Sequence, residues 1–150
     1  MDTFGNTSIL YRKKIGFLAS SKIASLSVLP TLDWAIEIAK REDVAIVSGF
    51  HSKMEREVLE ILLKGRCGMI CVLARPIYKV IPDKFREAFA QDRVLFISRN
   101  NSKSRMASRY LCQKRSEYIA TISDELVFSS LTSDSSLYPL LQCKADVLLL

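Results

Sequence analysis

The stretch Val44-Ala45-Ile46-Val47-Ser48-Gly49-Phe50-His51-Ser52-Lys53-Met54-Glu55 decides the fold. Its apolar first half predicts a buried strand, Ser48-Gly49 predicts a tight turn, and Ser52-x-x-Glu55 is a capping box that predicts the start of a helix. A strand that runs into a helix N-terminus presents backbone N–H groups at the carboxyl edge of a sheet. α/β proteins hold phosphates and other anions at that edge. The stretch therefore predicts both a scaffold and an anion site.

Similar apolar runs recur along the chain with helical patterns between them. Further strands are predicted at 15–19, 69–73, 94–97, 126–129 and 147–150. Helices are predicted at 32–39, 54–62, 82–89, 106–122 and 136–142. Pro30 fits the first turn of the first of these helices, and the fourth has a break near Gln113. These strands lack polar alternation and are separated by helices. We therefore predict an α/β, three-layer Rossmann-like fold with a mostly parallel sheet of about six strands and helices on both faces. We expect residues 1–150 to form one domain, with residues 1–14 as an N-terminal extension.

The composition, with 49% hydrophobic and 25% charged residues, is that of a globular domain rather than a disordered chain. No apolar run approaches the roughly 18 residues of a membrane span, so we expect a cytoplasmic protein without a membrane partner. The apolar residues 147–150 either pair inside the sheet, or are covered by a partner subunit, or belong to a longer chain. The sequence therefore leaves open whether the protein forms a homodimer.

The positive charge is concentrated in one part of the chain. Seven of the 22 basic residues and none of the 16 acidic residues lie between Arg93 and Arg115. This excess predicts a nucleic-acid patch formed by Arg99, Lys103, Arg105 and Arg109. A solvated, arginine-rich helix face is the alternative. Tyr110 and Tyr118 lie in the same segment and either stack on bases or pack in the core.

Polar side chains follow several of the predicted strands, whose carboxyl ends meet at one edge of a parallel sheet. Together they predict a phosphate-binding pocket made of Ser20, Ser21, Lys22, Ser48, Gly49, Phe50, His51, Ser52, Lys53, Arg75, Arg115, Thr132 and Ser133. Gly49 permits either a positive φ or the close approach of a ligand. No G-x-G-x-x-G motif is present, so no dinucleotide cofactor is expected.

Few residues suggest catalysis or metal binding. His51 is the only histidine and is either a general base or a donor to a nearby carbonyl. Cys67 and Cys71 would need two distant partners to hold zinc, so we expect reduced thiols and no metal.

Two segments resemble the DprA/Smf family of DNA-processing proteins. Arg115-Ser116-Glu117-Tyr118-Ile119-Ala120-Thr121-Ile122-Ser123-Asp124 is similar to the family's R-N-x-x-I-A-x-L-S-D segment, and Ser48-Gly49 after a strand fits the same family. The resemblance covers about residues 15–134, and Gly49–Glu55 looks like a compact, single-domain subgroup. The family is Rossmann-like and related to the lysine-decarboxylase-like (LOG) nucleotide-binding proteins. The resemblance implies DNA processing and single-stranded DNA binding through Ser48, Gly49 and Arg115.

The chain also departs from these families. Phe50-His51-Ser52-Lys53 stands where DprA-type proteins have a second glycine and an aspartate, and Ser116 replaces an asparagine. The segment 131–135 lacks the glycines and the glutamate of the phosphoribohydrolase loop P-G-G-x-G-T-x-x-E. Phosphoribohydrolase activity is therefore not implied.

We expect a non-catalytic module that binds the phosphates of a nucleotide or of single-stranded nucleic acid. One alternative is a small-nucleotide hydrolase with His51 as the base and Asp124 or Asp134 as the carboxylate. The other is an oligomerising scaffold domain whose pocket is vestigial.

Overall fold

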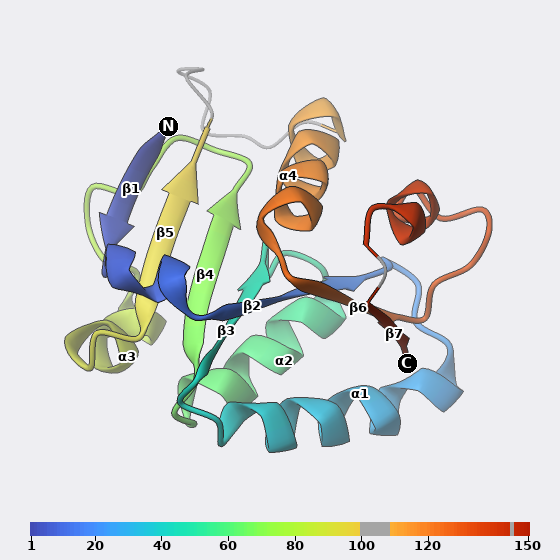
Figure 1. The fold of residues 1–150 in the computed structure, drawn as a ribbon, viewed down its shortest axis with the longest axis horizontal. Helices are drawn as coiled ribbons and strands as arrows, with labels where there is room; N and C mark the ends of the chain where they lie inside the picture. The colour runs from blue at the N-terminus through green and yellow to red at the C-terminus, as the bar shows by residue number, and fades with distance from the viewer. Residues whose placement is uncertain (100–108, 145) are drawn as a thin grey trace.

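The computed structural model describes residues 1–99, 109–144 and 146–150 of the chain. A seven-stranded sheet runs through it in the order β1-β5-β4-β3-β2-β6-β7 (Figure 1). Neighbouring strands are parallel except β1, which pairs antiparallel with β5. The strands are β1 (Asp2–Gly5), β2 (Lys13–Ala19), β3 (Val44–Ser48), β4 (Gly68–Leu73), β5 (Val94–Ser98), β6 (Glu125–Ser129) and β7 (Val147–Leu149).

Helices cover both faces of this sheet and make three layers (Figure 1). One face packs against α1 (Ser25–Ala39), α2 (Lys53–Leu63), α3 (Arg86–Ala90) and the 3-10 helix η2 (Asp83–Phe85). The other face packs against α4 (Arg109–Ile122) and the 3-10 helices η1 (Thr7–Tyr11) and η3 (Tyr138–Gln142). The predicted three-layer Rossmann-like fold is confirmed.

The central strands are apolar at consecutive positions because both of their faces are buried. In β3, Val44 and Ile46 belong to the core under α1 and α2, whereas Ala45 and Val47 belong to the core under α4. All four side chains are fully buried. Successive side chains of a strand point to opposite faces, so a strand covered on both sides shows no polar alternation.

The cysteines predicted to be reduced thiols are free. Cys67 and Cys71 lie in the apolar core, where burial raises the pKa of Cys67 to about 11 and raises that of Cys71 further. Among the residues that the structure describes, no group of three or more His, Cys, Asp or Glu side chains could hold a metal ion.

The N-terminal segment differs from its interpretation as an extension. Asp2–Gly5 forms the edge strand β1, so the sheet has seven strands rather than about six. The strand was missed because Phe4 is its one large apolar side chain. Phe4 packs against the rings of Phe89 and Phe96, at 5.2 and 6.3 Å between ring centroids.

Three predicted helices also differ in detail. α1 begins at Ser25, so Pro30 lies inside the helix, and Ile38 rather than Ile36 is buried. Pro30 is exposed, so water can reach the carbonyl group that its missing N–H leaves unpaired. α4 is continuous at Gln113, and the part predicted before Arg109 lies outside the described residues. The helix predicted at 136–142 is the shorter η3.

Among the described residues, the C-terminal strand β7 pairs with β6 alone and forms the second edge of the sheet. Leu148 and Leu149 are 46% and 58% exposed on it. The edge carries no charge and no proline within Val147–Leu149, the features that usually prevent pairing with another chain. Self-association through this edge stays a prediction.

Within the described residues, no helix is long and apolar enough to cross a membrane.

Arg93, counted above in the basic segment, has a structural role. It is 7% exposed, and its guanidinium donates to the carbonyls of Leu62, Leu63 and Cys67 at 3.2, 2.7 and 3.0 Å. It also donates to the Gln91 side chain at 2.8 Å. These bonds tie the C-terminal end of α2 to the start of β5.

Replacing Arg93 by Met should therefore lower the free energy of unfolding by about 3 kcal/mol, because buried carbonyl groups lose a charged donor. Arg86→Met is the matched control, since Arg86 is 68% exposed and forms an ion pair with Asp83 at the surface. The control should cost no more than about 0.5 kcal/mol. Urea unfolding measures both, and equal losses would contradict the structural role of Arg93.

Candidate nucleic-acid interface

The parallel strands β2 to β6 bring most of the predicted site residues to one edge of the sheet. Each of these five strands has a polar residue at or just after its carboxyl end, namely Ser20, Ser48, Arg75, Arg99 and Ser130. Such a carboxyl edge is where ligands of open α/β sheets bind. The side chains at this edge nevertheless separate into distinct clusters.

The turn between β3 and α2 is occupied by a carboxylate of the protein itself. Glu55 accepts hydrogen bonds from the backbone N–H groups of His51 and Ser52 at 2.9 and 3.3 Å through Oε1, and from that of Ala19 at 3.1 Å through Oε2. The Ser52 hydroxyl in turn accepts from the Glu55 amide at 3.4 Å, so the predicted capping box is present. Glu55 is 5% exposed. The amides of His51 and Ser52, expected to face a phosphate, thus bind Glu55.

Gly49 lies against the side chain of Arg115 from α4. A Cβ atom at residue 49 would come within 2.5 Å of Nε and 2.8 Å of Cδ of Arg115. The positive φ in this turn belongs to Phe50, at 48°, rather than to Gly49. The glycine is therefore needed for the close approach of an arginine. A positive φ at residue 49 does not explain it.

A groove lies between α4 and the ends of β4 and β5, with a volume of about 260 Å³. Its charged and aromatic residues are Arg99, Tyr110, Lys114, Arg115 and Tyr118; its apolar floor is formed by Val72, Leu73, Ala74 and Leu111. Tyr110, Lys114 and Tyr118 recur every four residues, so they lie along one face of α4. The groove thus combines three cations with two tyrosine rings.

Cations lie over both rings. The guanidinium of Arg99 is 4.8 Å from the ring centre of Tyr118, and the ammonium of Lys114 is 5.6 Å from that of Tyr110. The hydroxyl of Tyr118 also donates to the sulfur of Met1 at 3.2 Å. Tyr110 is 66% exposed, whereas Tyr118 is only partly exposed. Tyr110 therefore has the more accessible ring.

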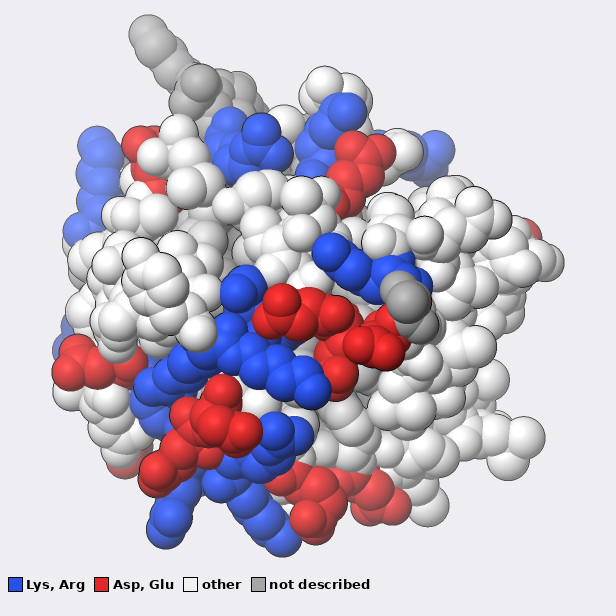
Figure 2. Space-filling model, in the orientation of Figure 1, with Lys and Arg blue, Asp and Glu red and all other residues white. Residues whose placement is uncertain are grey.

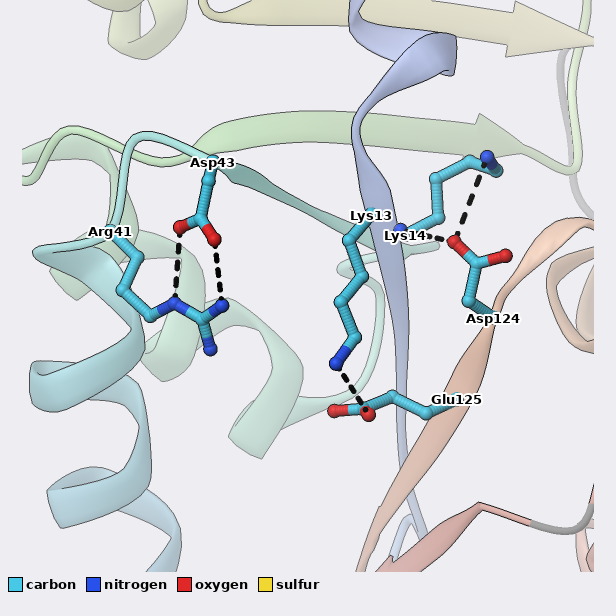
Figure 3. A network of polar contacts seen from close by, with 6 residues as sticks. All are labelled: Lys13, Lys14, Arg41, Asp43, Asp124 and Glu125. Carbon is cyan, nitrogen blue, oxygen red and sulfur yellow. Dashed lines mark hydrogen bonds and ion pairs between the residues drawn. The ribbon is translucent and has the colours of Figure 1, made fainter.

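Away from the groove, six basic side chains of the described residues lie within 4.0 Å of a carboxylate. Figure 2 shows blue and red groups side by side over the centre and lower part of one face. The pairs away from the groove are Lys13–Glu125, Lys14–Asp124, Lys40–Glu37, Arg41–Asp43, Arg66–Glu42 and Arg86–Asp83. Figure 3 shows three of them at the amino end of the sheet.

The groove arginines differ from these paired residues. Neither Arg99 nor Arg115 has a carboxylate within 4.0 Å among the described residues, whereas Lys114 pairs with Glu117 at 3.4 Å. Arg115 Nε is buried and has no hydrogen-bond partner in the part of the chain that the structure describes. A buried donor without an acceptor costs free energy, which an anionic ligand can recover.

Other predicted ligand residues lie outside the groove. Ser20 and Lys22 are in the loop after β2, and the hydroxyls of Ser20 and Ser135 are 3.3 Å apart. Thr132 donates to Asp134, and this hydrogen bond holds the pKa of Asp134 below its ordinary value. Lys22 adds a smaller effect in the same direction.

The remaining predicted residues have other surroundings. The guanidinium of Arg75 lies 4.4 Å from the ring centre of Tyr78 and donates from Nε to the Pro76 carbonyl at 3.0 Å. Ser48 is buried, and its hydroxyl accepts from the amide of Phe50 at 3.2 Å. The exposed residues Ser21, Lys53, Arg109 and Ser133 have no part in the groove. Lys103 and Arg105 lie outside the described residues.

The structure does not bring the proposed hydrolase residues together. His51 follows β3 at the carboxyl edge, whereas Asp124 precedes β6 at the opposite edge. The carboxylate of Asp124 accepts from the backbone N–H of Lys14 at 2.7 Å, and its own amide donates to the Lys14 carbonyl at 2.7 Å. Asp124 therefore fixes the start of β6 beside β2. Asp134 lies in an exposed loop.

Some groove residues were not predicted as site residues. Lys114 enters the sequence analysis only as part of the basic segment, and for Tyr110 and Tyr118 both stacking on bases and packing in the core are left open. The spacing of Tyr110, Lys114 and Tyr118 at every fourth position was the available signal, because it places them along one side of a helix. The apolar residues of the groove floor look like ordinary strand residues in the sequence, so no signal marked them.

Comparisons with known proteins support the fold. No family model and no curated protein sequence matches the chain. Among solved structures, DNA processing protein A from Helicobacter pylori, described for its single-stranded DNA binding mode, has a TM-score of 0.71 at 19% identity. The match covers 94% of this chain and 65% of that one. DprA from Streptococcus pneumoniae has a TM-score of 0.75 at 14% identity, over 98% of this chain and 53% of that one.

The chain therefore spans less than two thirds of either DprA protein. The resemblance inferred from Ser48-Gly49 and from residues 115–124 is confirmed for the arrangement of strands and helices, at identities too low to extend it to activity. By its architecture, the chain has the fold of DNA processing protein A.

Proposed function

We propose that the groove between α4 and the ends of β4 and β5 binds single-stranded nucleic acid, in a role related to DNA processing. The observation that carries the proposal is the pairing of two arginines, Arg99 and Arg115, with two tyrosines in one groove. Neither arginine has a carboxylate partner among the described residues. The published description of the Helicobacter pylori protein as a single-stranded DNA binder adds support through the shared fold.

The chemistry of the groove suits a flexible single-stranded nucleic acid. Phosphates of single strands are bound by basic grooves, and their unpaired bases stack on aromatic rings without strict sequence preference. Arg115 offers a buried N–H that lacks an acceptor, and Lys114 adds a nearby charge. Tyr110 offers the more exposed ring for stacking.

The two tyrosines have different parts in this proposal. The face of Tyr118 lies under Arg99, and its hydroxyl donates to Met1, so we assign it to holding the Arg99 guanidinium in place. Tyr110 then carries the base. This division needs no catalytic group, so the module stays a binding domain in the proposal. A cytoplasmic location stays a prediction.

Binding of a thymine oligonucleotide should depend steeply on salt. Release of counterions at three cations, Arg99, Lys114 and Arg115, gives a slope of log K against log salt of about −2, which is roughly a 15-fold loss from 50 to 200 mM. Tyr110→Ala should weaken binding about tenfold through lost stacking, with the slope unchanged. Arg115→Ala should reduce the slope by about 0.7. Fluorescence anisotropy of a labelled oligonucleotide measures the affinity and its salt dependence for the unmodified protein and for both variants.

Arg41→Ala is the matched control for charge. Arg41 is held by Asp43 at 2.8 Å near the amino end of the sheet, away from the groove (Figure 3). Its loss should leave the affinity for the oligonucleotide unchanged. An equal loss of affinity in Arg41→Ala and Arg115→Ala would mean that net charge, rather than the groove, binds the strand.

Gly49→Ala tests the geometry of the groove without removing a charge. The new methyl group would displace the Arg115 guanidinium, which can move because it is the end of a flexible side chain. We expect the affinity for the oligonucleotide to fall as it does in Arg115→Ala. The double variant should lose nothing further, because both changes remove the same interaction. Additive losses in the double variant would show that Gly49 acts independently of Arg115.

A further inference from the structure

We infer that Glu55 is an internal anion that determines which ligands the carboxyl edge accepts. Its carboxylate fills the amide-lined turn between β3 and α2 and so excludes free phosphate and the phosphate of a mononucleotide. The protein is thereby left with the side-chain groove on the other side of Gly49, which suits an extended strand. The inference about single-stranded nucleic acid rests on the proposed function, whereas the exclusion of phosphate is independent of it.

The contacts of Glu55 are those expected of a bound anion. Its two oxygens accept from three backbone N–H groups, those of Ala19, His51 and Ser52, at 2.9 to 3.3 Å. The three donors come from two different strand ends, at the last residue of β2 and in the turn after β3. Phosphate-binding loops present backbone N–H groups in a similar way. The carboxylate therefore occupies donors that an external phosphate would need.

Burial makes this occupation difficult to reverse. Glu55 is 5% exposed and lies in the first turn of α2, a helix of 11 residues whose N-terminus favours negative charge. An entering phosphate would have to displace the carboxylate and leave it buried without its donors, or else place a second negative charge beside it. Both arrangements are strongly unfavourable in a buried site.

The other side of the turn is built differently. Gly49 lies against Arg115, whose side chain reaches the groove. Ligand phosphates in the groove meet guanidinium and ammonium groups rather than fixed backbone amides. Because these cations are carried by separate side chains along α4 and at the end of β5, we expect affinity to come from several phosphates and a stacked base. A polymer meets that requirement and a mononucleotide does not.

The direct test replaces Glu55 by Ala and measures thermal unfolding in increasing inorganic phosphate or AMP. The unmodified protein should show no rise of the unfolding midpoint at concentrations up to 10 mM in buffers of matched ionic strength. Glu55→Ala frees the three amides, so it should gain a saturable rise of about 5 °C at saturating phosphate. Glu57→Ala, which removes an exposed charge from the same helix, should behave like the unmodified protein.

If Glu55→Ala does not fold, Glu55→Gln keeps the size of the side chain and removes its charge. It should gain phosphate-dependent stabilisation that is weaker than expected for the alanine variant. Stabilisation of the unmodified protein by phosphate, or no gain in whichever variant folds, would overturn the inference. Binding of the thymine oligonucleotide is measured in parallel and should persist in the Glu55 variants. Its absence in the unmodified protein would count against the proposed function alone.

Discussion

The hydrogen bonds of the Glu55 carboxylate set the geometry of the carboxyl edge. They join the end of β2, through Ala19, to the turn after β3, through His51 and Ser52. One buried side chain therefore fixes the first turn of α2 against two adjacent strands. Because this group is itself an anion, it also changes the chemistry of a turn that could otherwise bind phosphate.

The same turn also adjoins the cations of the groove through Gly49. Gly49 leaves room for Arg115 on the α4 side of the turn, and Arg115 lies beside Arg99 and Lys114 in the groove. The basic side chains at the amino end of the sheet are instead paired with carboxylates, as Figure 3 shows. The groove thus brings together two arginines, Arg99 and Arg115, that have no carboxylate partner among the described residues.

The sequence predicted the layers of the fold well, because buried parallel strands such as Val44–Ser48 are apolar throughout. It did not predict β1, whose pairing depends on β5 rather than on its own pattern. It placed Glu55 in a capping box, since that motif is local. The sequence did not predict the hydrogen bond from the Ala19 amide to Glu55, because that contact requires β2 and β3 to be neighbours. Likewise, Arg93 and Arg99 look equivalent in the sequence, and only burial separates the structural residue from the groove residue.

In this proposal a single-stranded nucleic acid binds in the groove of α4, while the Glu55 carboxylate occupies the backbone N–H groups of the turn after β3. An amide chemical-shift titration with a thymine hexanucleotide tests it most directly. We expect shifts at Arg99, Tyr110, Lys114 and Arg115, with the amides of His51 and Ser52 unchanged. Shifts centred on His51, Ser52 and Ala19, with the α4 residues unaffected, would contradict it.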